Sequence, residues 1–275
     1  MKGREVVALR RVPVAWNEAI EMFISVQHAA GKSPRTVKTY TSYLRGIARF
    51  CPDLDAIRED DLIAWLSATN WSAHARKSAR TVAGIFFAWA ARTGRVDGDP
   101  ATYLPTVHTP KGNPRPLPDT VFQRALKQCT PSDRLMMRLG RFAGLRASEI
   151  AAVHTDDLVD DVLTVVGKGQ KVRQIPIPMS TLRHEIRAAN GWLFPSPRGG
   201  HVTGQWVSVR LSSVLGGEWT AHNLRHAYAC AAVAGGGTIE AISALLGHSK
   251  LDTTMIYTAI PDASIRAAAS AAVAA

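Results

Sequence analysis

Six residues in the second half of the chain have side chains that could bind a phosphate group and act on it. They are two arginines, two histidines, a lysine and a tyrosine, namely Arg146, Arg225, His222, His248, Lys168 and Tyr257. Arginine can bind phosphate oxygens through two parallel hydrogen bonds, and a tyrosine hydroxyl can attack phosphorus once its proton is removed. Because phosphoryl transfer depends mainly on positioning and charge stabilisation, this set could form a phosphate site that needs no carboxylates or metal ligands.

Arg146 lies two residues after Gly144 in the stretch AGLRASEIAAV, where one helix is expected to end and another to begin. A guanidinium at such a point can bind an anion. Glu149 follows three residues later and can lie on the same side, where it would orient the arginine. The same spacing also suits an ordinary surface salt bridge, so this pair alone does not identify a site.

The stretch TAHNLRHAYA places three basic side chains on one side of an expected helix. With Thr220 as the N-cap, His222, Arg225 and His226 fall at positions i, i+3 and i+4. Two histidines at this spacing could instead bind zinc. However, the HExxH pattern is absent, since Asn223 follows the first histidine, and the helix offers no acidic residue as a third ligand. An anion or carboxylate is the preferred partner of this face.

Lys168 and Tyr257 lie in two further stretches that each allow two interpretations. Lys168 stands between Gly167 and Gly169 at the tip of an expected hairpin, where it could reach a phosphate or form a plain solvated turn. Tyr257 follows His248 by nine residues in LLGHSKLDTTMIYTAI, and it also fits the apolar stripe of a helix. Each residue alone is explained without chemistry, but together the six form a phosphate site.

The elements that would position these residues differ between the two parts of the chain. Before residue 105, apolar residues recur at helical spacing in four stretches, which predicts an all-helical bundle. We expect helices at residues 14–31, 34–50, 59–69 and 73–94. Ser33 is the expected N-cap of the second helix, with Pro34 at its first position, and the fourth helix follows Ser72. Later helices are interrupted by DVLTVVGKGQKVRQIPIP, where two β-branched runs flank a Gly-Lys-Gly-Gln turn and predict a β-hairpin. The expected fold class is mainly α with a small antiparallel hairpin or sheet in the second, catalytic domain.

A proline-rich segment separates the two parts. Six of the fifteen prolines fall between Asp99 and Asp119, which indicates a semi-rigid linker. We therefore expect a helical domain at residues 1–105, a linker at 106–117, a catalytic domain at 118–257 and a C-terminal segment at 258–275.

The composition favours a nucleic-acid partner and a reducing compartment. Lys and Arg number 33 against 22 Asp and Glu, and the resulting net charge of +11 is spread over the whole chain, as suits a partner that touches every domain. The three cysteines form no CxxC pair, which argues against a disulfide framework or a zinc ribbon. No apolar run approaches the ~18 residues that cross a bilayer, so we expect a cytosolic protein without membrane contact.

Four stretches resemble, in order and spacing, the sequence blocks of the tyrosine recombinases, also called phage integrases. They are AGLRASEIAAVHTDDL, VVGKGQKVRQIPIP, TAHNLRHAYA and LLGHSKLDTTMIYTAI, and SPRTVKTYTSYLRGIARF resembles the core-binding domain of the family. The resemblance covers residues 12–260. The HxLRH block, followed by an LGH block and a tyrosine nine residues later, is very specific, and no catalytic position departs from the pattern.

The resemblance implies a covalent mechanism. Tyr257 would attack the scissile phosphate, giving a 3′-phosphotyrosine and a free 5′-hydroxyl. Arg146 and Arg225 would bind the non-bridging oxygens, and Glu149 would orient Arg146. Because the bond energy is kept in the covalent link, no metal, ATP or other cofactor is expected.

The other implied roles concern protons and hydrogen bonds. His248 would donate a hydrogen bond to the phosphate, and His222 would assist proton transfer at the tyrosine. Lys168 would protonate the leaving 5′-oxygen, with Lys171 as the competing lysine. His226 matches the family block but would be structural.

The resemblance also implies how the protein meets double-stranded DNA. The two domains would form a C-shaped clamp, and four protomers would assemble on two core-type sites and exchange strands through a Holliday junction. The free protein would be a monomer or a weak oligomer, and residues 258–275 would pass to a neighbouring protomer. The expected DNA contacts are Arg35, Lys38, His74, Arg76, Lys77, Arg80, Lys171 and Arg173.

The biological role is the least determined expectation. About a dozen residues precede the helical domain, too few for the additional domain that reads arm-type sites, so the chain resembles a simple integrase of a phage or mobile element. A Xer-like resolvase of chromosome or plasmid dimers is the alternative, and a type IB topoisomerase and a non-catalytic DNA-binding protein are rivals. The expected location is the bacterial cytoplasm, at the nucleoid. The ending SAAVAA also resembles bacterial degradation tags.

Overall fold

The computed structural model describes residues 11–68, 70–110, 114–167 and 169–247. The chain divides into two compact units, Met1–Lys111 and Gly112–Ala275, and the division falls inside the proline-rich segment. None of the described helices is long and apolar enough to cross a lipid bilayer.

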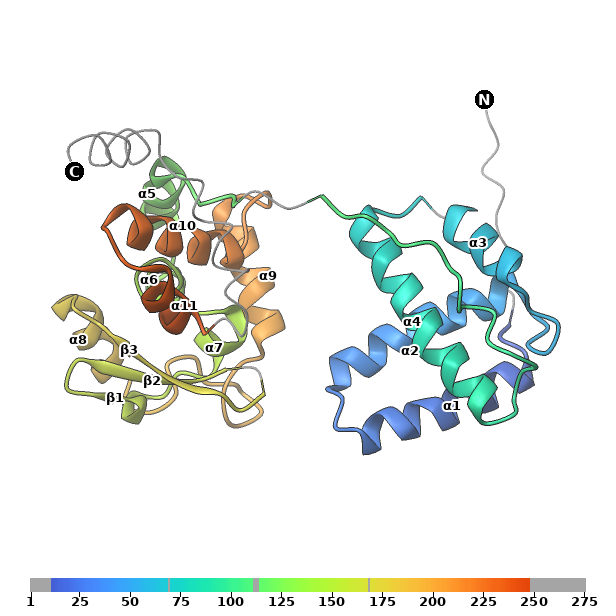
Figure 1. Cartoon of the computed structure of the whole chain (residues 1–275). Helices are drawn as coiled ribbons and strands as arrows, with labels where there is room; N and C mark the ends of the chain where they lie inside the picture. Colours follow the sequence, from blue (N-terminus) through green and yellow to red (C-terminus); the bar gives the residue numbers. More distant parts are fainter. Residues whose placement is uncertain (1–10, 69, 111–113, 168, 248–275) are drawn as a thin grey trace, which may run out of the picture. The chain divides into compact units, whose positions relative to one another are not determined.

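The described part of the first unit is built from helices, in agreement with its expected class (Figure 1). They are α1 (Val14–Ala29), α2 (Pro34–Phe50), α3 (Glu59–Ala68) and α4 (Ala73–Arg92). Serine caps begin two of them: the Ser33 hydroxyl accepts the N–H of Thr36, and the Ser72 hydroxyl accepts the N–H of Ala75. Such caps satisfy main-chain donors that have no partner within the helix, which is why the sequence located these starts correctly.

Aromatic side chains fill the core of the first unit. Trp16 stacks on Phe86 with ring centroids 5.6 Å apart. Phe23 meets the same Phe86 ring edge-on, at 5.4 Å and 83°. All three rings are fully buried, and both geometries are favourable for aromatic pairs. The core thus fixes α1 against α4.

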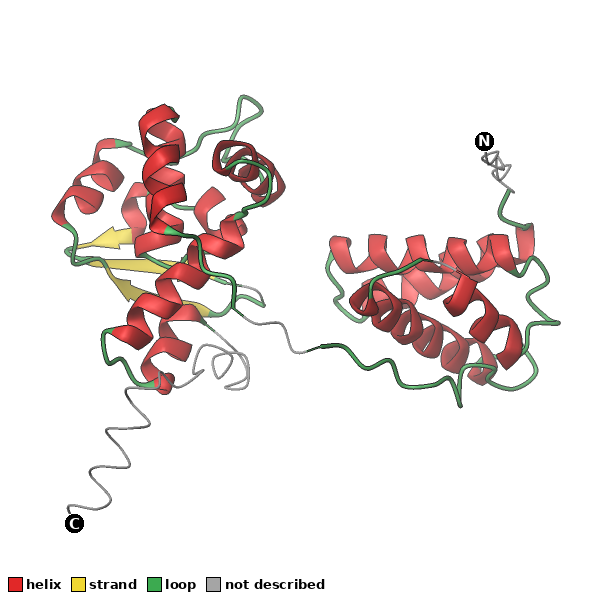
Figure 2. Ribbon diagram, turned by 90° about the horizontal axis from the view of Figure 1, so that it is seen from above, coloured by secondary structure: helices red, strands yellow, loops and turns green. Residues whose placement is uncertain are grey.

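The second unit combines helices with a small sheet (Figure 2). Its elements are α5 (Asp119–Gln128), α6 (Pro131–Phe142), α7 (Ala147–Ala151), the 3₁₀ turn η1 (Thr155–Asp157), β1 (Leu158–Val159), β2 (Val162–Val166), β3 (Val172–Pro176), α8 (Ser180–Ala188), α9 (Gly204–Leu215), α10 (Ala221–Ala234) and α11 (Ile239–Leu246). The sheet order is β1-β2-β3, and both pairings are antiparallel. The expected hairpin is β2–β3, and the expected class, mainly α with a small antiparallel sheet, is confirmed.

The register of the hairpin determines which side chains point inward. Leu163 pairs with Ile175, and Val165 pairs with Arg173. Directly paired residues lie on the same face of an antiparallel sheet, and Leu163, Val165 and Ile175 are all buried. Arg173 therefore occupies an inward-facing position of β3, in a row with core residues.

The last residues of the proline-rich segment are bound to the start of α10. The side-chain amide of Asn223 donates to the carbonyl of Arg115 at 2.8 Å, and the N–H of Leu117 donates to the carbonyl of Asn223 at 3.0 Å. The Arg115 guanidinium also lies over the Trp219 ring, 4.4 Å from its centroid. This end of the segment is therefore fixed to α10.

Candidate active site

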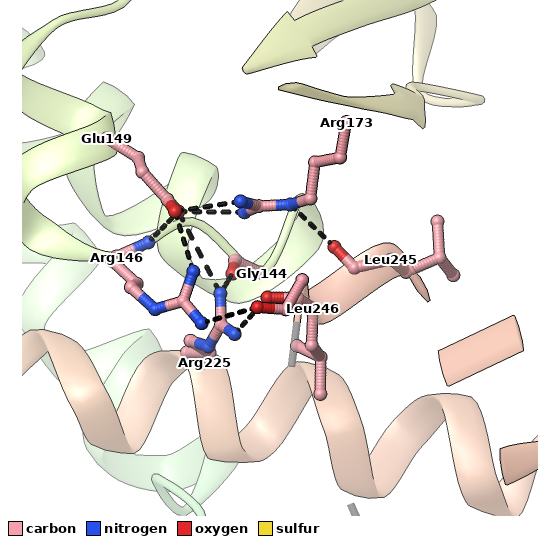
Figure 3. A network of polar contacts seen from close by, with 8 residues as sticks. Gly144, Arg146, Glu149, Arg173, Arg225, Leu245 and Leu246 are labelled. Carbon is pink, nitrogen blue, oxygen red and sulfur yellow. Dashed lines mark hydrogen bonds and ion pairs between the residues drawn. The ribbon is translucent and has the colours of Figure 1, made fainter. Parts of the chain in front are cut away.

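A buried carboxylate, that of Glu149, lies at the centre of a cluster of arginines (Figure 3). Only 1% of its side chain is exposed. Its Oε1 accepts hydrogen bonds from Arg146 Nη1 at 2.7 Å and from Arg173 Nη1 at 2.8 Å. Its Oε2 accepts from the main-chain N–H of Arg146 and from Arg173 Nη2, both at 2.7 Å. One negative charge thus holds two guanidinium groups.

The local sequence explains why Glu149 meets Arg146. Arg146 is the N-cap of α7, with extended backbone angles, and Glu149 is the third residue of that helix. A glutamate at this position reaches back to the N–H of the cap residue. Here the carboxylate also binds the side chain of the cap residue, so the short helix α7 fixes both the main chain and the guanidinium of Arg146.

Arg225 reaches the same cluster from α10. It is 1% exposed, and its Nη1 donates to the carbonyl of Gly144 at 2.7 Å and lies 3.8 Å from Glu149 Oε2. Its Nη2 donates to the carbonyl of Leu246. Arg146 and Arg225, which are 79 residues apart by their numbers, are thus held by one carboxylate.

The end of α11 contributes main-chain acceptors to all three arginines. The carbonyl of Leu245 accepts from Arg173 Nε at 2.9 Å, and that of Gly247 accepts from Arg146 Nη2 at 3.1 Å. The Leu246 carbonyl accepts from Arg225, as above. Carbonyls in the last turn of a helix have no partner within the helix, and cations are favoured there. The guanidinium cluster therefore serves as the C-terminal cap of α11.

The electrostatics of the cluster keep Glu149 ionised. Burial would raise the pKa of this carboxyl, but the hydrogen bonds and charge of Arg173, together with the bonds from Arg146, lower it to about 2. Three guanidinium groups then face one carboxylate, so positive charge is in excess. Because the side chain of Arg146 is 33% exposed, that excess can act on an anion arriving from solvent.

The two histidines of α10 lie against each other beside the arginines. Their ring centroids are 4.1 Å apart. Desolvation and the charges of Arg225 and Arg146 lower the pKa of His222. Desolvation, His222 and Arg225 lower the pKa of His226 to about 4. Both imidazoles are therefore neutral at physiological pH. Among the described residues, no group of three or more His, Cys, Asp or Glu side chains is placed to hold a metal ion.

Known proteins are similar to this chain in sequence and in fold. Residues 117–263 match a family model described as the phage integrase family. Tyrosine recombinase XerA of Thermococcus kodakarensis is 34% identical, over 92% of this chain and 94% of the relative. Tyrosine recombinase XerC of Mycobacterium bovis is 31% identical, over 86% of this chain and 92% of the relative.

This chain belongs to the phage integrase family. Solved structures of integrases share its fold. A lambda integrase dimer bound to a COC′ core site matches with a TM-score of 0.74 and 20% identity, over 88% of this chain and 76% of that one. A lambda integrase tetramer bound to a Holliday junction matches with a TM-score of 0.71 and 20% identity, over 85% and 77%.

Of the six residues first singled out in this family member, the structure describes three. Arg146 caps α7, and His222 and Arg225 lie on α10. The structure brings the two arginines together at Glu149, and His222 lies close enough for their charges to lower its pKa. Lys168, His248 and Tyr257 lie outside the described residues, as does the C-terminal segment 258–275.

Arg173 is placed differently from what the sequence suggested. We expected it to contact DNA, but only 9% of its side chain is exposed, and its guanidinium is bonded to Glu149 and to Leu245. The signal that could have revealed this is the period of two along β3, which places Arg173 on the same face as Ile175. Lys171, two residues earlier in the turn, is exposed.

The other expected DNA contacts fall into two groups. Four of them are exposed on α2 and α4, namely Arg35, Lys38, His74 and Lys77. The remaining two are partly buried and bind main-chain carbonyls. Arg76 Nε donates to Leu66 at 3.1 Å, and Arg80 donates to Leu104 and Pro105, with Nε 2.8 Å from the Pro105 oxygen. These two arginines therefore have a structural role in the first unit.

Proposed function

We propose that this chain is a site-specific DNA recombinase that cuts and rejoins duplex DNA through a covalent bond between Tyr257 and a 3′-phosphate. The observation that carries the proposal is the Glu149 cluster, in which one buried carboxylate fixes Arg146 and Arg225 beside His222. The family relation supports it, because the named relatives are tyrosine recombinases.

The chemistry follows from the charges and protonation states at the cluster. The Tyr257 oxygen bonds to phosphorus as the bond from phosphorus to the 5′-oxygen breaks, so the phosphodiester energy is retained and no ATP is consumed. Arg146 and Arg225 stabilise the additional negative charge of the pentacoordinate state. His222 has a lowered pKa, so it is neutral near pH 7 and can accept the tyrosine proton.

Two further residues complete the proposed reaction. Lys168 returns a proton to the leaving 5′-oxygen, and His248 donates a hydrogen bond to the phosphate. No metal ion is assigned a step, because guanidinium groups supply the positive charge.

The proposed substrate is double-stranded DNA with paired core-type sites. We propose that four protomers assemble on two sites and exchange strands through a Holliday junction, and that residues 258–275 bind a neighbouring protomer. The exposed basic residues of α2 and α4 would contact phosphates. Lambda integrase has the same fold and is known as a dimer bound to a core site and as a tetramer bound to a Holliday junction, which supports this assembly.

A covalent adduct tests the proposed function. The full chain is incubated with nicked half-site DNA from its genomic neighbourhood. Cleavage releases a short fragment that carries the free 5′-hydroxyl, and its loss prevents religation. Protein–DNA adducts are resolved on a denaturing gel. The parent chain should form the adduct, and Tyr257→Phe should form none. Tyr103→Phe is the matched control, because Tyr103 lies in the other unit and is 81% exposed. An adduct with Tyr257→Phe would refute the assigned nucleophile, and no adduct with any half-site would refute the function.

The choice between integration and dimer resolution needs a second substrate. The similarity to tyrosine recombinases XerA and XerC is consistent with the Xer-like alternative, a resolvase of dimers. A plasmid with two directly repeated sites should then be resolved into two circles, whereas an integrase should join two different attachment sites. Relaxation of a supercoiled plasmid that lacks any site would instead indicate a type IB topoisomerase.

A further inference from the structure

The Arg173 guanidinium forms three hydrogen bonds within the Glu149 cluster and the end of α11. Its Nη1 and Nη2 bind the two oxygens of Glu149 at 2.8 and 2.7 Å, and its Nε binds the Leu245 carbonyl at 2.9 Å (Figure 3). Parallel bonds between a guanidinium and a carboxylate are strong and fix the orientation of both groups. The bonded edges of Arg173 face the protein interior.

Both oxygens that Arg173 holds are shared with Arg146. Oε1 is the acceptor of the Arg146 guanidinium, and Oε2 is the acceptor of its main-chain N–H. Oε2 also lies 3.8 Å from Arg225 Nη1. If Glu149 could rotate about its terminal bond, it would hold Arg146 and Arg225 in other orientations. The two parallel hydrogen bonds from Arg173 prevent this rotation of the Glu149 carboxylate.

Arg173 also meets the end of α11. In addition to its hydrogen bond with Leu245, Arg173 packs closely against Gly247. A Cβ atom added to Gly247 would lie 3.1 Å from Arg173 Cδ and 3.2 Å from Arg173 Nη1. Gly247 is in the left-handed region, with φ of 60°, and it is the last described residue before His248. Arg173 therefore sets the position from which the chain continues toward His248 and Tyr257.

A third neighbour is the base of the β2–β3 turn. A Cβ atom added to Gly167 would lie 3.4 Å from Glu149 Oε1 and 3.5 Å from Arg173 Nη1. Gly167 immediately precedes Lys168. Gly167 and Gly247, the residues just before Lys168 and His248, thus both lie close to the Glu149–Arg173 pair.

We infer that Arg173 is a positioning residue for strand cleavage, which holds Glu149 and the end of α11 in the arrangement that Arg146 and Arg225 require. This inference rests on the proposed recombinase function. Arg173 itself touches neither the phosphate nor the tyrosine in this assignment. Residues that orient groups in direct contact with a substrate or metal typically contribute about 10- to 100-fold to activity or affinity.

The test separates DNA binding from cleavage in the full chain. Single-turnover cleavage of the nicked half-site is followed with excess protein, giving a rate constant and an amplitude, and the DNA Kd is measured as a function of salt. Arg173→Gln should lower the rate constant about 10- to 100-fold, with the Kd, its salt dependence and the amplitude unchanged. Arg173→Lys keeps the charge but not the fork, so it should recover only part of the rate.

Two control variants make the result specific. Gln174→Ala alters an exposed residue on the same strand and should match the parent in every measurement. The double variant Arg173→Gln with Glu149→Gln should cleave little more slowly than Glu149→Gln alone, because residues that act through one network are not additive.

Each other outcome overturns the inference. A salt slope reduced by about 0.9 would identify Arg173 as a phosphate contact. A reduced amplitude with an unchanged rate constant, in Arg173→Lys as well, would show that the side chain only maintains the fold. A parent-like rate in Arg173→Gln would show that Arg173 is dispensable. A parent chain that forms no adduct would instead refute the proposed function itself.

Discussion

Charge compensation around Glu149 controls which groups of the site can change protonation. The carboxylate is ionised far below neutral pH because Arg173 and Arg146 bind it, with a pKa of about 2. Burial, together with the charge of Arg225, lowers the pKa of both His222 and His226, and the charge of Arg146 adds to the effect on His222. The cluster is therefore a region of fixed positive charge, and the histidines beside it are neutral at physiological pH.

The pKa of His226 predicts a pH dependence of stability. The folded protein binds a proton at His226 only near pH 4, whereas the ordinary histidine value is 6.5. The unfolded chain thus binds more protons between these values, and the free energy of unfolding should fall as the pH is lowered from about 6.5 to about 4, by up to about 1.4 kcal/mol per pH unit. Urea denaturation at several pH values measures this slope.

Substitution of the histidine checks the source of the slope. His226→Asn should flatten the pH dependence in this range. His184→Asn, which removes an exposed histidine of α8, should keep the parent's slope. An unchanged slope in His226→Asn would show that other groups cause the dependence.

At the residue scale, the sequence revealed the residue types and the one local pairing, but not the pairings between distant segments. Arg146 and Glu149 are close along the chain, so helical spacing alone suggested that they meet. Arg173 joins Glu149 across 24 residues, and Arg225 across 76, and such contacts depend on packing between elements. The main-chain carbonyls of α11 carry no sequence signature, because every residue has one.

The short helix α7 depends on its contact with α9. A Cβ atom added to Gly204, the first residue of α9, would lie 2.6 Å from the Cα of Ser148 and 2.9 Å from its nitrogen. Only a glycine permits this approach of two main chains. Ser148 lies between Arg146 and Glu149, so the distance between α7 and α9 determines where the cluster sits.

Gly204→Ala should therefore destabilise the protein and slow cleavage. Helix propensity alone would favour alanine by about 1 kcal/mol, but overpacking against main chain costs about 1–3 kcal/mol, so we expect a net loss. Thermal denaturation and the single-turnover rate measure the two effects. Gln205→Ala, at an exposed position of the same helix, should change neither. A variant as stable as the parent would show that α7 can move without cost.

Element boundaries were predictable where a side chain marks them. Serine and threonine caps at Ser33, Ser72 and Thr220 marked three helix starts. By contrast, β1 has two residues, too few for any periodic pattern. It forms because β2 offers it an antiparallel partner, which the sequence does not display.

Over the whole molecule, the excess positive charge predicts salt-dependent DNA binding. Each phosphate contact contributes about −0.9 to the slope of log K against log salt. Lys38 of α2 and Lys77 of α4 are exposed, so Lys38→Gln and Lys77→Gln should each make the slope less steep by about 0.9. Filter binding or fluorescence anisotropy at several salt concentrations gives the slopes.

A lysine elsewhere on the surface provides the comparison. Lys127→Gln, at an exposed position of α5, should leave the slope unchanged. Equal changes in all three variants would mean that binding follows net charge and not the surfaces of α2 and α4.

The described members of the Glu149 cluster all belong to the unit Gly112–Ala275, whereas α2 and α4 belong to the other unit. Under the proposed function, the choice of DNA target and the cleavage chemistry can therefore be modified separately. A library randomised on the outward positions of α2 and α4 would leave every member of the arginine–glutamate assembly intact. Directed evolution toward a new DNA target sequence could begin with such a library, while the residues of the Glu149 cluster stay unchanged.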